Sequence, residues 1–404
     1  MQDAHTAKDY SPFTPGIPVP LDFFVGREAE VRLLVEKAGA AASGRFERTF
    51  VLGDRGIGKS SLCSYAARAA ELEHNILPVH VFLGGVTGLE EMARRVFERL
   101  VKDSVGKPWH EKVKGFLGDH VKQVGLFGIT VEFDATLDQL SRLVNDFAPA
   151  LRNLLKTLGD TRTGLMLILD DLNGLAGSSR FAEWLKSLVD EVATGRDPLP
   201  LSLVLVGLPE RRNQLVQSQP SLARVFDLVE IKPLSEQEAE TFFRQSFASV
   251  GMAILQEAVQ PLWRFSGGYP PFAHEIGDAT FKADTDRVVT RRDAFSGISN
   301  AVDIIGGKYI QPQIYEAIRS QHYRSILSKL ALGDVVIRRK EYIHRLSSDE
   351  TKVFDNFLRK MRELGVLRQV RDLGPGVYMF SSLLYSTYFW LEAQRGVSDI
   401  PEVL

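Results

Sequence analysis

Cysteine and long apolar runs are nearly absent from this sequence. Cys63 is the only cysteine among 404 residues, which excludes a disulfide within the chain and favours a reducing compartment. Apolar runs such as LMLIL and LSLVLV are too short to cross a bilayer. The opening stretch, MQDAHTAKDY, lacks the apolar segment of a secretory signal. We therefore expect a cytoplasmic protein with no membrane partner.

The sequence also lacks an excess of charge of either sign. It holds 49 Lys and Arg against 51 Asp and Glu, a net charge of −2, so no global attraction to nucleic acid is expected. The hydrophobic fraction of 44% and charged fraction of 25% are those of an ordinary globular protein. At this length we expect two or three domains.

Alternating strand and helix patterns predict an α/β domain at 23–234, after an extended, proline-rich tail at 1–22. A helical pattern occupies 24–41. Nearly continuous apolar strands separated by helices indicate a buried, largely parallel sheet. The five expected strands are TFVLG (49–53), ILPVHVFL (76–83), LMLILD (165–170), LSLVLVG (201–207) and LVEIKPL (228–234).

Residues 84–164 are longer than one crossover helix requires, so we expect an insertion there. It contains a helix in GLEEMARRVFERL and a hairpin or strand at 124–133. One further helix at 137–158 leads back to the sheet.

The chain after the sheet is expected to be helical. Ser235-x-x-Glu238 is a capping box that opens an all-helical stretch over 235–300. Residues 301–404 show three helical patterns, the third opened by a second capping box at Ser347-x-x-Glu350, then two strands around Leu373–Gly376 and an aromatic helix. Three helices and a hairpin predict a winged helix. Its core is expected to include the aromatic cluster Tyr385, Tyr388, Phe389 and Trp390, and the alternative is that this cluster faces a partner.

A phosphate-binding loop is predicted at GDRGIGKS, which satisfies G-x-x-x-x-G-K-[ST] between a strand and a helix. Glycines let backbone N–H groups curl around a phosphate, and the dipole of the following helix adds to the attraction. Lys59 is expected to bridge the β- and γ-phosphates of ATP, and the Ser60 hydroxyl to bind Mg²⁺. The residues expected to bind the nucleotide here are Gly53, Asp54, Arg55, Gly56, Ile57, Gly58, Lys59, Ser60 and Ser61. Cys63 is expected to pack in the core.

Paired acids end the apolar strand LMLILDD, the pattern of a Walker B motif. Asp170 would hold the Mg²⁺ water shell, and Asp171 would orient the attacking water. The spacing from the phosphate loop predicts an extra strand between the two motifs.

The chain resembles AAA+ ATPases of the origin-recognition type and the related STAND signalling ATPases. FFVGREAEV (23–31) looks like the box that opens these proteins, and with GDRGIGKSS, LMLILDD, LSLVLVG and FSGGYPPF the resemblance covers about residues 20–300. It implies a parallel P-loop NTPase sheet with helices on both faces, an α-helical lid at 235–300 and a C-terminal winged-helix domain at 301–404.

The resemblance also implies roles for single residues. Val25, Gly26 and Arg27 would line the adenine pocket, or the apolar residues of this box belong only to the core. Pro270, in GGYP, would touch the nucleotide from the lid as in STAND proteins. The fourth strand departs from the family because it lacks the usual Asn, Thr or Ser sensor; Arg211 is a substitute sensor or a surface ion pair.

Arg224 matches the place of an arginine finger, a residue that reaches the γ-phosphate of a neighbouring subunit. The alternative is a local ion pair with a carboxylate such as Asp227. Asp171 stands where many AAA+ motors have Glu, and its shorter side chain makes slow hydrolysis plausible.

The third helix of the C-terminal domain has one apolar and one polar face. Its apolar stripe comprises Val353, Phe354, Phe357, Leu358, Met361 and Leu364. The other face carries Lys352, Asn356, Arg359 and Arg362, and Arg368 and Arg371 are expected on the first wing strand. Residues 301–404 hold 15 Lys and Arg against 12 Asp and Glu, and this excess of 3 is small for a DNA-binding domain.

Two functions follow from the sequence, with ATP and Mg²⁺ as cofactors in both. The first is a slow ATPase switch that forms a homo-oligomer when it holds ATP and then engages a protein partner. The second is a DNA-binding initiator or loader that uses the winged helix. A small-molecule kinase is disfavoured because the opening box, lid and winged helix would have no role in it.

Overall fold

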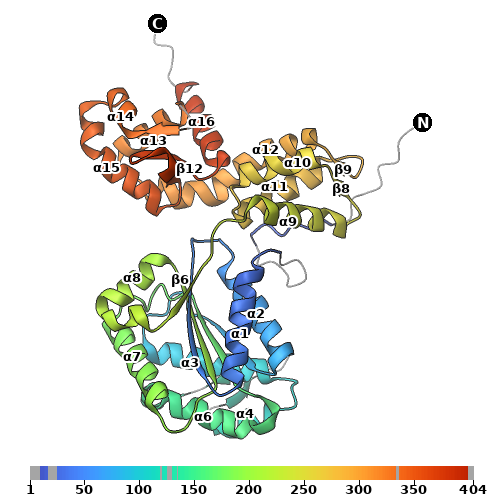
Figure 1. Ribbon diagram of the computed structural model, residues 1–404, viewed down its shortest axis with the longest axis vertical. Helices are drawn as coiled ribbons and strands as arrows, with labels where there is room; N and C mark the ends of the chain where they lie inside the picture. The colour runs from blue at the N-terminus through green and yellow to red at the C-terminus, as the bar shows by residue number, and fades with distance from the viewer. Residues whose placement is uncertain are drawn as a thin grey trace. The chain divides into compact units, whose positions relative to one another are not determined.

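The computed structural model describes residues 10–16, 25–118, 121–124, 130–133, 135–333 and 336–398. The chain folds as two units (Figure 1), one formed by Pro20–Lys232 and the other by Met1–Val19 together with Pro233–Leu404. No helix within the described ranges is both long enough and apolar enough to cross a membrane.

Five parallel strands form the sheet of the first unit, and all five were predicted. They lie in the order β2-β5-β6-β1-β7, so β6 is the extra strand expected between the phosphate loop and the paired acids. The strands are β1 (Phe46–Leu52), β2 (Leu77–Phe82), β5 (Leu165–Asp170), β6 (Leu201–Gly207) and β7 (Asp227–Glu230).

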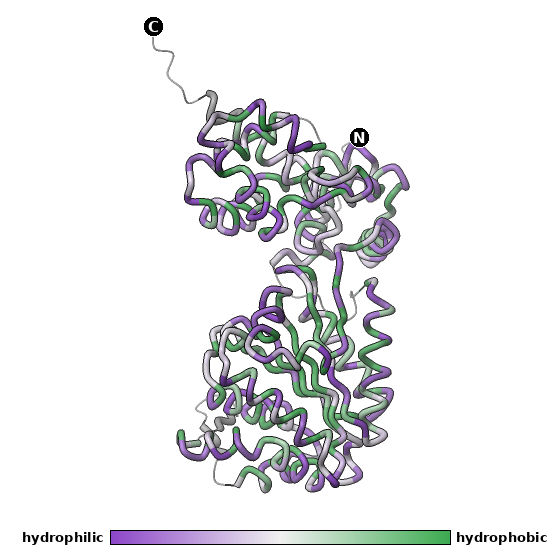
Figure 2. The backbone as a smooth tube through the Cα atoms, turned by 60° about the vertical axis from the view of Figure 1, so that its left-hand side comes forward, coloured by the Kyte–Doolittle hydropathy of each residue, from purple (hydrophilic) through white to green (hydrophobic). Residues whose placement is uncertain are grey.

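Helices cover both faces of this sheet. Leu165, Leu167 and Leu169 of β5 point into the larger core, whereas Met166 and Ile168 point to the opposite face because side chains alternate along a strand. The hydrophobic colour of the central strands in Figure 2 matches this burial on both sides. The helices on the Met166 face are α1 (Glu28–Ala42) and α2 (Lys59–His74); those on the other include α3 (Leu89–Ser104), α6 (Phe147–Leu158) and α7 (Ser179–Thr194).

The insertion contains more helices than predicted. The single helix expected at 137–158 is wrong: α5 (Leu137–Asn145) and α6 are separate helices joined at Asp146, whose φ of −102° and ψ of 30° are not helical. Pro149 fits the first turn of α6, where its missing N–H has no intrahelical partner to lose. The insertion also contains α4 (His110–Leu117), β3 (Val121–Val124) and β4 (Thr130–Phe133), and β3 and β4 pair as an antiparallel hairpin.

The second unit begins with helices, as predicted. The Ser235 capping box opens α9, with the Ser235 hydroxyl accepting from the N–H of Glu238. The helices are α9 (Glu236–Ser249), α10 (Gln256–Ser266), α11 (Pro270–Ala283) and α12 (Arg291–Ile305), with a short parallel pair, β8 (Ala253–Ile254) and β9 (Val288–Val289). A π-helix at Gly306–Tyr315 continues α12 and was not predicted.

The remaining elements of this unit combine helices with a small antiparallel sheet of order β10-β12-β11. The two expected strands are β11 (Leu367–Gln369) and β12 (Val377–Phe380), and β10 (Val336–Arg338) is an additional third strand. The helices are α13 (Gln321–Ala331), α14 (Arg339–Tyr342), α15 (Ser348–Glu363) and α16 (Leu383–Ser398).

The burial of α15 and α16 follows the predicted pattern with one exception. On α15 the central residues of the apolar stripe are buried, while Lys352, Asn356, Arg359 and Arg362 are exposed. On α16 Tyr385, Tyr388 and Phe389 are buried, but Trp390 is 45% exposed, so its expected place in the core is wrong.

A short N-terminal segment belongs to the second unit. Phe13, 3% exposed, lies among Phe242, Phe247 and His274 of α9 and α11. Gly277 makes room for it, because a Cβ at this position would lie 2.4 Å from the Phe13 ring. Residues 10–16 of the proline-rich tail thus pack on the second unit through Phe13. Residues 1–9 and 17–22 of the tail lie outside the described ranges.

Candidate nucleotide site

The predicted phosphate loop joins β1 to α2 in a conformation that requires glycine. Gly56 has φ of 78° and Gly58 has φ of 97°, both in the left-handed region. Gly53 is needed for a different reason: a Cβ there would lie 2.8 Å from the Ile57 side chain and 2.9 Å from the Ile231 carbonyl oxygen. Ile57 is 1% exposed and anchors the loop from within.

Lys59 folds back over this loop. Its Nζ donates hydrogen bonds to the carbonyl oxygens of Gly53 at 2.8 Å and Asp54 at 2.7 Å. Burial lowers the pKa of Lys59, and the negative charges of Asp170, Asp54 and Asp171 oppose this shift. The loop lysine and both acids of the second motif are therefore within electrostatic reach of one another.

The first turn of α2 offers backbone N–H groups toward an anion. The helix begins at Lys59 after the N-cap Gly58, and its first turn contains no acidic residue. The opening N–H groups of a helix have no intrahelical acceptor and carry the positive end of the dipole. Ser60 and Ser61 are half-buried here, and Asp54 and Arg55 are exposed.

The paired acids follow β5 at the carboxyl edge of the sheet. Asp170 is 3% exposed, whereas Asp171 is only partly buried and has φ of 61°, a left-handed conformation that is rare outside glycine. Asn173 Nδ2 donates to Asp171 Oδ1. The other oxygen, Oδ2, lies 3.0 Å from where a Cβ on Gly84 would stand, so Asp171 is directed toward the segment after β2.

His80 is a site residue that the sequence analysis missed. From β2, its Nε2 lies 2.9 Å from Oδ2 of Asp170, and its Nδ1 lies 3.1 Å from Oγ of Ser64 on α2. His80 is 8% exposed. No sequence motif marks it, because the contact arises only when β2 pairs with β5 and α2 covers that face.

Cys63 is 0% exposed in α2, and burial raises the pKa of its thiol well above the usual value. A buried thiol of this kind is inert, so the prediction of core packing is confirmed.

The opening box has an unusual backbone. Gly26 has φ of 77° and Arg27 φ of 64°, and Arg27 is 6% exposed at the N-cap of α1. Val25 is half-buried. Residues 23 and 24 of the box lie outside the described ranges.

The two arginines of the later segments have distinct surroundings. Arg211, in α8 (Pro209–Ser218), donates to Gln214 at 3.0 Å and forms no ion pair with any described residue. Arg224 ends the short 3₁₀ helix Pro220–Arg224 and is exposed. No described carboxylate forms an ion pair with Arg224, and Asp227, the carboxylate named as its alternative partner, pairs with Lys37.

Pro270 lies at the first position of α11, where proline loses no intrahelical hydrogen bond. It belongs to the second unit, whereas the phosphate loop belongs to the first, so its contact with a nucleotide stays a prediction. The preceding Gly268 accepts a hydrogen bond from the N–H of Leu234 at 2.8 Å, which fixes the start of the helical region.

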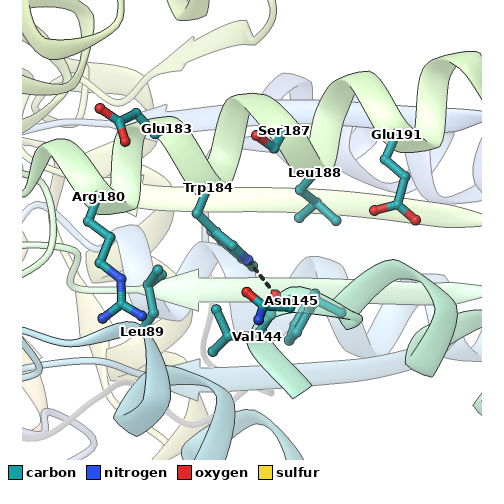
Figure 3. A pocket seen from close by; sticks show the side chains of 10 residues that line it. Leu89, Val144, Asn145, Arg180, Glu183, Trp184, Ser187, Leu188 and Glu191 are labelled. Carbon is teal, nitrogen blue, oxygen red and sulfur yellow. Dashed lines mark hydrogen bonds between the residues drawn. The ribbon is translucent and has the colours of Figure 1, made fainter. Parts of the chain in front are cut away.

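A separate pocket lies between α7 and the segment joining α5 to α6 (Figure 3). Trp184 crosses it and donates its indole N–H to the Val144 carbonyl oxygen at 3.0 Å. Arg180 and Glu191 lie toward its two ends. No residue predicted to bind nucleotide lines this pocket.

The parallel sheet, the glycine loop after β1, the helix that follows it and the acids after β5 define a P-loop nucleotide-binding protein. The AAA ATPase domain family matches residues 24–206. This match supports an ATPase domain of the AAA+ kind over residues 24–206, on the P-loop NTPase fold described above.

Solved structures share the fold over nearly the whole chain. The Walker-type ATPase paby2304 of Pyrococcus abyssi is 17% identical with a TM-score of 0.57, covering 91% of this chain and 96% of that chain. The Aeropyrum pernix ORC2 protein in its ADP form is 12% identical with a TM-score of 0.50, covering 91% and 93% respectively. At these identities the likeness describes the fold alone. The comparison with curated proteins finds no match.

Proposed function

We propose that this protein is an ATP-dependent molecular switch: it binds ATP with Mg²⁺, hydrolyses it slowly, and uses the nucleotide state to control self-assembly and engagement of a partner. One observation carries the proposal. Lys59, Asp170 and Asp171 interact electrostatically around a loop whose glycine geometry suits a phosphate. A lysine and two acids beside the amino end of a helix fit a nucleoside triphosphate that binds together with Mg²⁺.

Mg²⁺ fits the donor groups at this site. It prefers hard oxygen ligands and usually keeps several waters. The Ser60 hydroxyl and the Asp170 carboxylate supply such oxygens, and Oδ1 of Asp170 accepts no hydrogen bond from the described residues. Bound Mg²⁺ would neutralise charge that develops on the phosphates. Lys59 would exchange its two carbonyl acceptors for phosphate oxygens when ATP enters.

Slow hydrolysis is supported by the state of Asp171. Its carboxylate accepts from Asn173 and is directed toward Gly84, in a left-handed backbone conformation. Such backbone strain gathers at functional sites. A short acid held by its own loop must reorient before it can align water on a γ-phosphate, so we infer that turnover is limited by this step.

The same proposal includes contacts to the adenine of ATP and a contact from the helical lid to the nucleotide. Val25, Gly26 and Arg27 would form the adenine pocket, supported by the left-handed backbone at Gly26 and Arg27, which opens a close approach for a flat ring. Pro270 would touch the nucleotide from the helical lid, which we assign to residues 235–300.

Self-assembly is supported by Arg224. It is exposed, and no described carboxylate forms an ion pair with it. It precedes the amino end of β7, whereas its own phosphate loop follows the carboxyl end of the parallel strand β1. An arginine so placed suits a phosphate on another subunit better than its own.

The partner would be a protein, bound through the region at 301–404, which we interpret as a winged helix. Acids of α15 pair with cations around it: Asp349 pairs with Lys352 of the same helix at 2.8 Å, and Asp355 pairs with Arg339 of α14 at 2.6 Å. Such mixed charge lacks the basic face of a DNA-binding domain.

A DNA-binding initiator is the second candidate, supported by the exposed side chains of Asn356, Arg359 and Arg362 on one face of α15. Steeply salt-dependent binding of duplex DNA that is lost in Arg362→Ala would favour this second function over the first.

The experiment that tests the switch measures the mass of the full chain by light scattering with ATP, with ADP and without nucleotide. We expect a larger species only with ATP, and its decay to the smaller species as ATP is consumed. The same mass in all three conditions would reject nucleotide-controlled assembly while leaving ATP binding itself to be measured separately.

A further inference from the structure

His80, Ser64 and Asp170 form a buried chain of hydrogen bonds behind the phosphate loop. His80 Nε2 lies 2.9 Å from Asp170 Oδ2, and its Nδ1 lies 3.1 Å from Ser64 Oγ. His80 is 8% exposed and Asp170 3% exposed. We propose that His80 is a positioning residue, which holds Asp170 in the orientation needed to serve Mg²⁺ and is itself oriented by Ser64. This inference rests on the proposed use of Mg²⁺ at the site.

The fold brings these three residues to one face of the sheet. Val79 and Val81 of β2 point into the larger core, so His80 points to the opposite face, the one that α2 covers. Asp170 shares that face, because Leu169 beside it also points into the larger core. β2 and β5 are direct neighbours in parallel register, which places His80 level with Ile168, two residues before Asp170 on the same face of the sheet.

The chemistry of the three side chains determines which group donates and which accepts in each of these hydrogen bonds. An ionised carboxylate only accepts, so Nε2 of His80 carries the proton and donates to Asp170. In the neutral imidazole with its proton on Nε2, Nδ1 has a lone pair, and the Ser64 hydroxyl donates to it. Both ring nitrogens are satisfied, and rotation of the ring would break both contacts. Groups of this kind commonly orient the ligands of metal sites.

The two oxygens of the Asp170 carboxylate have different roles in this arrangement. Oδ2 is held by His80, and Oδ1 accepts no hydrogen bond from the described part of the chain, so it is left for the metal and its waters. Ser64 lies one turn after Ser60 on the same side of α2. Helix α2 therefore positions both proposed oxygen donors to Mg²⁺: it carries Ser60 directly, and it holds Asp170 through Ser64 and His80. Stacking of His80 on Phe82, with ring centroids 4.6 Å apart, further limits the imidazole.

The test compares the binding of a fluorescent ATP analogue in EDTA with its binding in Mg²⁺. The ratio of the two dissociation constants measures what Mg²⁺ contributes. We expect His80→Ala to lower this ratio by about 10-fold to 100-fold while binding in EDTA is unchanged. His80→Gln, whose amide N–H can replace Nε2–H, should keep most of the ratio. Equal weakening with and without Mg²⁺ would mean a structural role only and would overturn the proposal.

His110 provides the matched control. Its Nδ1 also lies within hydrogen-bond distance of a serine, Ser104 at 2.7 Å, but it contacts no residue of the nucleotide site. His110→Ala should leave the ratio unchanged. A comparable loss in this variant would show that any Ser–His pair of the unit has the same effect, and would overturn the assignment to His80.

Two further variants keep the test decisive if His80→Ala fails to fold. Ser64→Ala removes only the group that orients His80, and we expect a smaller drop of the ratio in the same direction. In an Asp170→Asn background, adding Ser64→Ala should change nothing more, because Ser64 acts through His80 on Asp170. A wild-type ratio in Ser64→Ala, and in His80→Ala where that variant folds, contradicts the positioning role. A wild-type protein that binds no ATP contradicts the proposed function instead.

Discussion

Lys59 is the residue on which ATP binding depends most directly. Lys59→Ala removes a charge-assisted contact to the phosphates, so we expect ATP affinity to fall roughly 100-fold or more, measured by calorimetry. The fold should persist, because Lys59 now donates only to two carbonyl oxygens of its own loop. Lys112→Ala is the control, since Lys112 also donates to a backbone carbonyl, that of Leu158, but away from the loop. Equal ATP affinity in wild type and Lys59→Ala would reject the site.

Substitutions of the two adjacent acids, Asp170 and Asp171, should affect different steps: nucleotide binding and hydrolysis, respectively. Asp171→Asn keeps the phosphate cradle, so we expect normal nucleotide binding and a steady-state turnover lowered by about 100-fold or more. Asp170→Asn should instead weaken binding only when Mg²⁺ is present. Asp103→Asn, which loses just an exposed ion pair with Arg99, is the control. Full turnover in Asp171→Asn would move the water-orienting role to another group.

The sequence allowed prediction of those site residues whose signal is local. The loop glycines and Lys59 lie in one short motif, and Asp170 follows an apolar strand, so each could be recognised from its neighbours. His80 could not, because its two partners, Ser64 and Asp170, are brought to it by strand pairing and helix packing. The orientation of Asp171 toward Asn173 was equally hidden, since it depends on a single left-handed backbone conformation.

At the scale of elements, the N-terminal segment and α11 form a pH-sensitive contact. The backbone N–H of Thr14 donates to Nδ1 of His274 at 3.1 Å, and burial lowers the pKa of His274 to about 4 from 6.5. The folded state therefore resists protonation that the unfolded state accepts. Stability is complete above about pH 6.5 and is lost as pH falls toward about 4, by up to about 3 kcal/mol.

Denaturant unfolding of the helical unit at several pH values measures this loss. His274→Gln retains an acceptor that does not titrate, so the slope of unfolding free energy against pH between about 4 and 6.5 should flatten. His322→Gln, on the exposed surface of α13, should keep the wild-type slope. An unchanged slope in His274→Gln would show that other groups cause the acid sensitivity.

Strands and capped helices were predictable, and irregular joints between helices were not. The capping boxes at Ser235 and Ser347 each start a helix where expected, because each is a local backbone and side-chain exchange. The break between α5 and α6 at Asp146 lacks such a signal, as does the π-helix at Gly306–Tyr315. In the π-helix, Gln311 donates to the Tyr388 hydroxyl at 2.9 Å, a contact between segments far apart in sequence.

At the scale of the whole molecule, activity should depend on contact between subunits. Arg224 is exposed beside the amino end of β7, and Asp227, its nearest candidate carboxylate in sequence, is already paired with Lys37. Its guanidinium becomes useful only when a second subunit brings a γ-phosphate alongside. An arginine finger supplied in this way is worth on the order of 10³-fold or more in rate. We therefore expect ATPase activity per subunit to rise with protein concentration.

Mixing two inactive variants gives the sharpest form of this prediction. Arg224→Ala lacks the finger but keeps a complete phosphate loop, and Lys59→Ala lacks the loop but keeps the finger. A mixed assembly contains interfaces that combine the intact loop of one with the intact arginine of the other, so part of the activity should return. Arg212→Ala is the control, since Arg212, in the nearby α8, donates to the Ala223 carbonyl within the same subunit. Activity independent of concentration, with no recovery on mixing, would show that Arg224 does not act across a subunit boundary.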